Sequence, residues 1–125
     1  MSQQKIEIDV RSQGEYQVLR PEGDLDVYTV GSLRDAIGTM IDDGTPHVVV
    51  DLDGVPFMDS SGLGALMGGV RRLREAGGDL AIACTREQHL KLFTITGFGE
   101  GVRGQRGELE QRGFQAVLAE DFAVG

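Results

Sequence analysis

Acidic and hydroxyl side chains crowd one short stretch near the middle of this sequence. Asp51, Asp53 and Asp59 are followed directly by two adjacent serines, Ser60 and Ser61. A carboxylate can act as a general acid, a general base or a nucleophile, and a serine hydroxyl can accept a phosphate group. The stretch therefore predicts either phosphoryl transfer onto a carboxylate or regulation through a serine.

The serines stand between a strand and a helix. Residues 47–52 form a short, valine-rich apolar run, typical of a central strand that is covered on both faces. A helix is expected from Ser60 or Ser61 to Ala76, because apolar residues recur there at helical spacing. In parallel α/β sheets, ligand and regulatory sites lie at the carboxyl ends of strands, so this junction is the expected site.

Two interpretations of the junction stay open. Serine is among the best helix N-caps, so a purely structural role explains Ser60 or Ser61. Gly62 and Gly64 weaken the first turn of the helix, however, and require another explanation. An uncovered backbone there would let another chain or an anion approach closely.

A phosphate on Ser60 would act as an electrostatic switch. It adds about −1.5 to −2 charges, which a helix N-terminus tolerates, so the fold should survive. A partner pressed against the same spot would bury an uncompensated charge at a cost of about 3–5 kcal/mol, or about 100-fold or more in affinity. Asp59 would add like-charge repulsion. Phe57 and Met58 are either core residues beneath the loop or an apolar rim for that partner.

The remaining segments alternate between strand and helix patterns. Helices between the later strands require parallel strand pairs. The expected fold class is therefore α/β (α+β), a single domain with a mixed sheet of about four to five strands and helices packed on it. Residues 108–122 fit one amphipathic helix. We expect strands at 5–10, 16–20, 47–52 and 80–84 and helices at 29–41, 60–76 and 86–95.

Composition limits the function and location of the chain. Its 125 residues suit one domain, and a single cysteine, Cys84, excludes an internal disulfide and a cysteine-rich zinc site. A net charge of −8 makes nucleic acid and anionic membranes poor partners and favours a basic or mixed partner surface. No apolar run approaches the roughly 20 residues that span a bilayer, and no signal-peptide core begins the chain. We therefore expect a cytoplasmic protein.

Three segments resemble the STAS-domain family of anti-sigma factor antagonists. The run from Val50 to Gly64, which contains the letters DSSGLG, resembles the signature of that family. Residues 23–29 and 90–97 resemble two further family segments. The resemblance implies a STAS-like domain at residues 1–98. Family members usually continue with an apolar strand and a last helix, so residues 99–125 are expected to be an atypical C-terminal segment, a helix packed on that domain or trailing from it.

The resemblance also implies a function. Members of the family bind an anti-sigma factor that is also a serine kinase, and so release a sigma factor. The kinase phosphorylates the first hydroxyl residue of the signature, which is Ser60 here with Ser61 as the alternative, and a serine phosphatase reverses the step. The chain itself is then no enzyme and needs no cofactor or metal. The implied partner-binding residues are Asp26, Met58, Asp59, Ser60, Ser61, Gly62, Leu63 and Gly64, with Asp26 and Asp59 beside the modified serine.

Two other functions stay open. Residues 48–54 also resemble the nucleophile motif of haloacid-dehalogenase-type phosphatases, in which Asp51 would attack phosphate with help from magnesium. That chemistry needs a downstream lysine and a further acidic pair, and the sequence offers only Lys91 and residues 120–121. Alternatively, the chain is a STAS-like scaffold that binds partners or a small ligand and is never phosphorylated.

Some remaining residues have both a structural and a functional explanation. His47 and His89 are too isolated in the sequence for a metal site and are expected to be structural, and Cys84 is expected to be a small core residue. The arginines at 71, 72 and 74 form either a solvated face or a surface for acidic groups of the partner. The glycines at 68 and 69 allow either close packing or a flat surface for the partner.

Overall fold

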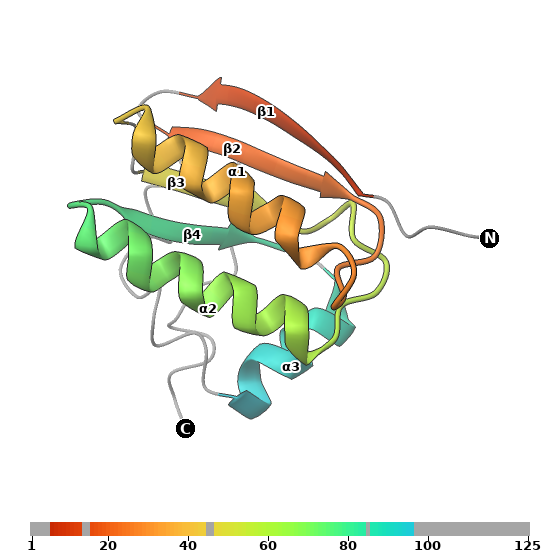
Figure 1. Ribbon diagram of the computed structural model, residues 1–125. Coiled ribbons are helices and arrows are strands. Elements are labelled where there is room, and N and C mark those ends of the chain that lie inside the picture. The colour runs from red at the N-terminus through yellow and green to blue at the C-terminus, as the bar shows by residue number, and fades with distance from the viewer. Residues whose placement is uncertain (1–5, 14–15, 45–46, 85, 97–125) are drawn as a thin grey trace.

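The computed structural model describes residues 6–13, 16–44, 47–84 and 86–96, which form a four-stranded mixed sheet with helices packed on it (Figure 1). In order across the sheet, the strands are β1 (Glu7–Gln13), β2 (Tyr16–Glu22), β3 (His47–Asp51) and β4 (Asp79–Ala83). β1 pairs with β2 in antiparallel fashion, whereas the pairs β2–β3 and β3–β4 are parallel. The predicted fold class is confirmed. The helices are α1 (Val30–Asp42), α2 (Ser60–Glu75) and α3 (Glu87–Thr96).

β3 lies at the centre of the core. The valines of residues 48–50 are each 0% exposed, so this strand is covered on both faces as predicted. Figure 1 shows α1 and α2 side by side over one face of the sheet. Gly69 allows close packing, since a Cβ there would lie 2.8 Å from Ile37 of α1 and 3.1 Å from Leu80 of β4. Packing therefore explains Gly69, whereas a Cβ at Gly68 would meet no neighbouring atom of the described residues.

Both strands of the hairpin are longer than predicted. β1 runs on to Gln13, and β2 continues through Pro21 to Glu22. The predicted end of β2 before Pro21 was wrong, although proline has no N–H to donate to a ladder. The parallel ladder between β2 and β3 stops at Leu19, so Pro21 pairs only with β1, opposite Ile8. The antiparallel pairing with β1 therefore extends β2 to Glu22, which lies opposite Glu7, and extends β1 to Gln13, which lies opposite Tyr16.

The other predicted elements begin and end close to the observed ones. The predicted C-terminal segment at 99–125, including the amphipathic helix at 108–122, lies outside the described residues. Within the part of the chain that the structure describes, no helix is long and apolar enough to cross a membrane.

Cys84 follows β4 and is 0% exposed, which confirms it as a small core residue. Burial raises the pKa of its thiol from 9.0 to about 11. In the unfolded chain the thiol therefore ionises near pH 9, whereas in the folded protein it stays protonated until about pH 11. The unfolded state loses its proton first, so this group makes the free energy of unfolding fall as the pH rises through that window.

We expect urea denaturation at several pH values to show this loss of stability in the wild type between about pH 9 and pH 11. The loss should be smaller in Cys84→Ala, which has no thiol to ionise. An identical pH dependence in the two proteins would contradict the assignment.

Candidate functional site

The helix α2 begins at Ser60, and Asp59 is its N-cap. The backbone of Asp59 is extended, and its Oδ1 accepts hydrogen bonds from the N–H groups of Ser61 and Gly62 at 2.8 and 3.3 Å. The Asp59 carbonyl accepts a third, from the N–H of Leu63 at 3.1 Å. The interpretation of a serine as the cap was wrong, because a carboxylate just before the helix already takes the N–H groups of the first turn.

Ser60 lies on the surface with its hydroxyl unused. Its side chain is exposed, and its hydroxyl has no hydrogen-bond partner among the described residues. Ser61 is half-buried, so Ser60 is the more accessible of the two hydroxyls. Because Asp59 occupies the neighbouring N–H groups, a charged group attached to Ser60 finds few donors to neutralise it.

The loop between β2 and α1 lies against the residues that precede α2. Leu25 forms a parallel bridge with Met58. Its N–H donates to the Phe57 carbonyl at 2.9 Å, and its carbonyl accepts from the N–H of Asp59 at 3.3 Å. This pairing brings the next residue, Asp26, to the start of α2.

Asp26 shapes the loop in which it lies. Its carboxylate Oδ1 accepts a hydrogen bond from the N–H of Tyr28 at 2.9 Å, and its own N–H donates to Thr29 Oγ1 at 2.9 Å. The Thr29 hydroxyl in turn donates to the carbonyl of Asp24 at 2.9 Å. These bonds close a turn directly before α1, and Asp26 is half-buried there.

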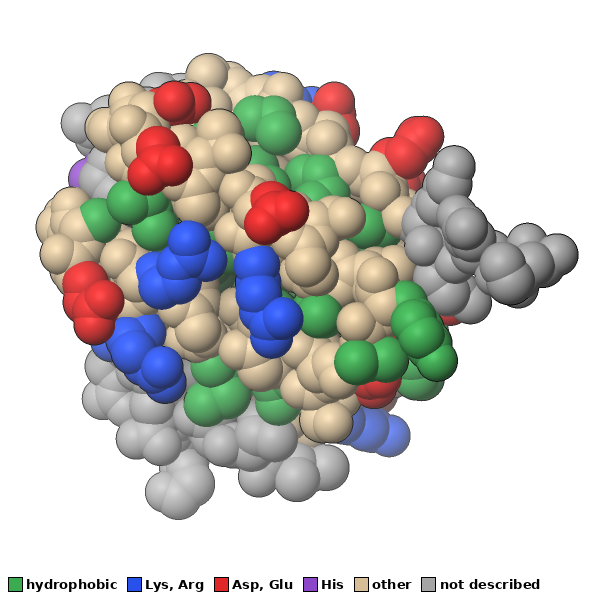
Figure 2. All heavy atoms as spheres, in the orientation of Figure 1, with side chains coloured by type: hydrophobic (Ala, Val, Ile, Leu, Met, Phe, Trp, Pro, Cys, Tyr) green, Lys and Arg blue, Asp and Glu red, His purple; other side chains and the backbone are tan. Residues whose placement is uncertain are grey.

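Apolar side chains surround this end of α2. Val27 and Tyr28 are 62% and 78% exposed, and Phe57 is 53% exposed. Figure 2 shows hydrophobic side chains gathered on the side of the molecule where the β2–α1 loop and the start of α2 lie. Phe57 therefore belongs to the rim, whereas Met58, at 7% exposed, belongs to the core. The sequence did not single out Val27 and Tyr28, and their only signal is that two apolar residues follow Asp26 in a loop.

The two glycines in the first turn of α2 have different surroundings. Gly62 is buried, and a Cβ there would lie 2.7 Å from Met58 Cγ and 2.9 Å from the Leu25 carbonyl oxygen. The explanation by an open backbone therefore does not hold for Gly62, which instead allows α2 to approach the neighbouring loop. Gly64 is exposed, and among the described residues no atom beyond its chain neighbours and the backbone of α2 lies within 4 Å of a Cβ built there, so its backbone is open. Leu63 between them is in the core, at 4% exposed.

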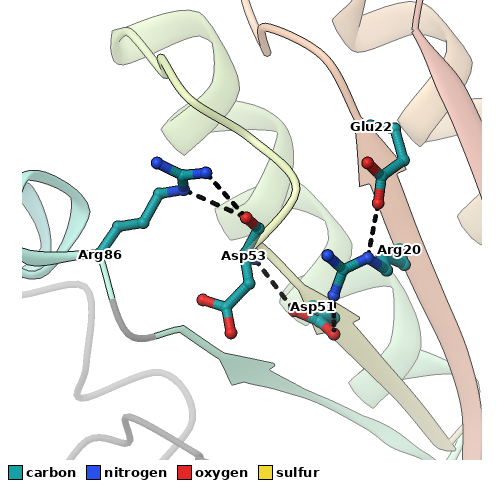
Figure 3. Close-up of polar contacts among 5 residues, drawn as sticks. All are labelled: Arg20, Glu22, Asp51, Asp53 and Arg86. Atoms are coloured by element: carbon teal, nitrogen blue, oxygen red, sulfur yellow. Dashed lines mark hydrogen bonds and ion pairs between the residues drawn. The ribbon is translucent and has the colours of Figure 1, made fainter.

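Asp51, at the end of β3, is held through both of its carboxylate oxygens (Figure 3). Oδ2 accepts from Arg20 Nη1 at 2.9 Å, and Oδ1 accepts from the N–H of Asp53 at 3.0 Å. Arg20 also pairs with Glu22. The pKa of the Arg20 guanidinium is raised, chiefly by its hydrogen bond to Glu22. The charge of Asp51 and the hydrogen bond to Asp51 raise it further, whereas burial acts in the opposite direction. Asp51 is 8% exposed and serves as an anchor of the loop rather than as a nucleophile.

Side chains at the start of α3 reach the same loop. Arg86, which directly precedes α3, donates through Nε and Nη2 to the carbonyl of Asp53 at 3.2 and 3.0 Å (Figure 3). His89 Nε2 lies 2.6 Å from the carbonyl of Val55, and His89 is 1% exposed, which confirms its structural role. His47 is exposed and packs edge-on against the Tyr16 ring. Among the described residues, no group of three potential metal ligands occurs.

The arginines near the end of α2 lie on the outer face of that helix, where Figure 2 shows basic side chains. Arg74 Nε pairs with Asp79 at 3.2 Å. Arg72 Nη1 donates to the carbonyl of Arg34 in α1 at 3.3 Å. Both contacts lie within the chain and favour the solvated-face explanation for Arg72 and Arg74.

Comparison with known proteins places the chain in one family. The family model of the STAS domain matches residues 7–116. The anti-sigma-B factor antagonist of Staphylococcus aureus is 35% identical over 92 residues, which are 74% of this chain and 85% of that protein. The chain belongs to the STAS-domain family of anti-sigma factor antagonists.

Solved structures of antagonists agree with this membership. An anti-sigma factor antagonist from Mycobacterium paratuberculosis is 27% identical, with a TM-score of 0.63 over 76% of this chain and 80% of that one. The Bacillus cell fate determinant SpoIIAA in its phosphorylated form is 25% identical, with a TM-score of 0.62 over 85% of this chain and 97% of that one.

Membership removes one of the functions left open. Antagonists of this family are non-enzymatic regulators that work by partner switching under the control of phosphorylation. The phosphatase interpretation of Asp51 was therefore wrong, in agreement with its fully engaged carboxylate. The resemblance stated from the sequence is confirmed. The division of the chain near residue 98 stays a prediction, because residues 97–125 lie outside the described part.

Gly62 and Gly64 of α2 give a matched test of how the antagonist builds this site. Gly62→Ala should lower the free energy of unfolding by about 1–3 kcal/mol, because its Cβ pushes α2 away from Leu25 and Met58. Gly64→Ala adds the same methyl group in open space and should leave stability unchanged or raise it by about 0.5–1 kcal/mol. Urea denaturation measures both values. Equal effects would contradict the packing role given to Gly62.

Proposed function

We propose that the unphosphorylated chain binds an anti-sigma factor that is also a serine kinase, and so releases a sigma factor. Phosphorylation of Ser60 by that kinase ends the binding, and a serine phosphatase restores it. The observation that carries this proposal is the Ser60 hydroxyl, which is exposed and has no partner among the described residues. The similarity to SpoIIAA, a protein solved in unphosphorylated and phosphorylated forms, supports it.

The proposed interface surrounds Ser60. Three of its residues, Met58, Gly62 and Leu63, are buried and act by shaping the backbone beneath the surface. Gly64 leaves the backbone open to a partner. The full set comprises Asp26, Met58, Asp59, Ser60, Ser61, Gly62, Leu63 and Gly64, extended by the exposed apolar side chains of Val27, Tyr28 and Phe57. Those apolar side chains supply area whose burial contributes about 25 cal/mol per Å².

The proposed switch is electrostatic and needs no change of fold. The Asp59 carboxylate already accepts from the N–H groups of Ser61 and Gly62, so a phosphate on Ser60 keeps most of its charge uncompensated. In the free protein, water and salt screen that charge. Under a bound partner the same charge costs about 3–5 kcal/mol, or about 100-fold or more in affinity. The carboxylates of Asp59 and Asp26 add to the repulsion.

Ser61 is the alternative acceptor, and its partial burial favours Ser60 over it. The partners of the proposed cycle are proteins, namely the kinase and the phosphatase. The net charge of −8 argues against direct contact with nucleic acid or an anionic membrane. We place the cycle in the cytoplasm, where a sigma factor acts on transcription.

Two substitutions at Ser60 test the switch. Ser60→Ala should bind the anti-sigma factor kinase of the source organism as tightly as the wild type, because the interface stays uncharged. Ser60→Asp should bind about 100-fold more weakly and unfold at the same urea concentration as the wild type, because the penalty arises only at the interface. Isothermal titration calorimetry gives the affinities.

Phosphopeptide mapping after incubation with that kinase and ATP provides the covalent test. Phosphate is expected on Ser60 in the wild type and in Ser61→Ala, and it should be absent from Ser60→Ala. Binding without any phosphorylation would favour the scaffold that is never phosphorylated. Equal affinities of Ser60→Ala and Ser60→Asp would refute the electrostatic mechanism.

A further inference from the structure

The loop that joins β3 to α2 lacks regular structure, yet each carbonyl from residue 53 to residue 57 has a hydrogen-bond donor. The β2–α1 loop supplies two of these donors from its backbone, and the start of α3 supplies the rest from side chains. The backbone donors are Gly23 N–H, which bonds the Gly54 carbonyl at 3.0 Å, and Leu25 N–H, which bonds the Phe57 carbonyl at 2.9 Å. The side-chain donors are Arg86 to Asp53 at 3.2 and 3.0 Å, His89 to Val55 at 2.6 Å, and Gln88 to Pro56 at 3.0 Å.

Asp53 is the residue at which this loop is fixed from both sides (Figure 3). Its N–H donates to Asp51, whose carboxylate is in turn held by Arg20. Its carbonyl accepts two hydrogen bonds from the Arg86 guanidinium. The path of the chain out of β3 therefore depends on a side chain that follows β4 in the sequence.

The hydrogen bonds from α3 can be removed one at a time by mutation, whereas those from the β2–α1 loop cannot, since they come from the backbone. His89 is the least suitable of the three side chains for mutation. It is 1% exposed, and its loss would leave the Val55 carbonyl without a donor inside the core. Arg86 is half-buried and Gln88 is exposed, so each can be replaced without opening the core.

We infer that Arg86 and Gln88 are positioning residues for the switch. They hold the loop in the one conformation that presents Phe57 and Ser60 together to the kinase, although neither contacts Ser60 in the structure. The inference rests on the proposed function. Without these hydrogen bonds the loop samples other conformations, and a partner that needs one of them must order the loop as it binds, which lowers affinity.

The test measures the kinetics of Ser60 phosphorylation by the anti-sigma factor kinase, with this antagonist as substrate. We expect Arg86→Ala and Gln88→Ala each to raise KM about 5–10-fold and to leave kcat within about twofold, because loop order affects binding and not the bound geometry. Amide hydrogen exchange should become faster in both variants at residues 53–55 and 57–58, which flank Pro56 and carry backbone N–H groups. Arg86→Lys should restore most of the affinity, since an ammonium group can donate to the Asp53 carbonyl.

Lys91→Ala is the matched control for Arg86→Ala. It removes one positive charge from α3, the helix that Arg86 directly precedes, and Lys91 is exposed and makes no hydrogen bond or ion pair among the described residues. Its KM should equal that of the wild type.

Three outcomes would overturn the inference. The first is a KM of Arg86→Ala and Gln88→Ala equal to that of Lys91→Ala despite faster exchange, which would mean a merely structural role. The second is no rescue of Arg86→Ala affinity by Arg86→Lys. The third is a wild type that the kinase does not phosphorylate on Ser60, in which case the proposed function fails first and the inference fails with it.

Discussion

A chain that leaves a buried strand must still satisfy its backbone N–H and carbonyl groups, and this constraint governs the connection between β3 and α2. β3 is covered on both faces, so the loop that follows it begins in a desolvated environment. Its donors come from two segments on either side, the β2–α1 loop and the start of α3. The start of α2 is therefore placed by both segments at once, and with it the serine on which the switch depends.

The position of the N-cap separates the modification from the stability of the helix. A serine that serves as the cap would lose this role on phosphorylation, and loss of a cap costs about 0.5–2 kcal/mol of stability. Here the capping carboxylate belongs to Asp59, and the hydroxyl of Ser60 makes no bond among the described residues. Phosphorylation can then act on the interface alone. A switch that left the fold intact in both states would be reversible without a cycle of unfolding.

The elements were predictable because periodicity and turn residues act locally. The valine run gave β3, the helical spacing gave α2, and the crowding of Asp59, Ser60 and Ser61 at their junction gave the candidate site. The wrong choice of cap has a local cause, since aspartate and serine are nearly equal as caps and stand side by side. The extended backbone of Asp59 and the hydrogen bonds to its carboxylate decide between them.

The parts that could not be predicted are those that join distant segments. Arg86 lies far along the chain from Asp53, and Leu25 lies far from Met58. No spacing rule relates such pairs before the sheet order is known. Gly62 belongs to the same class, because its reason for being glycine is the approach of the Leu25 carbonyl. Its neighbour Gly64 has open space instead, so two identical residues in one turn needed the structure to be told apart.

The overall charge of −8 and the charge of a phosphate on Ser60 act over different distances. A more acidic chain attracts a basic or mixed partner surface more strongly from afar, so phosphorylation on its own would speed the encounter. Salt screens that attraction at distances beyond about 8–10 Å, whereas the charge of a phosphate trapped against a bound partner is screened far less. The contact penalty of several kcal/mol exceeds the gain from steering, which changes rates of association more than affinity. The proposed switch must therefore act mainly by speeding dissociation, and this suits a kinase that has to meet its substrate before it releases it.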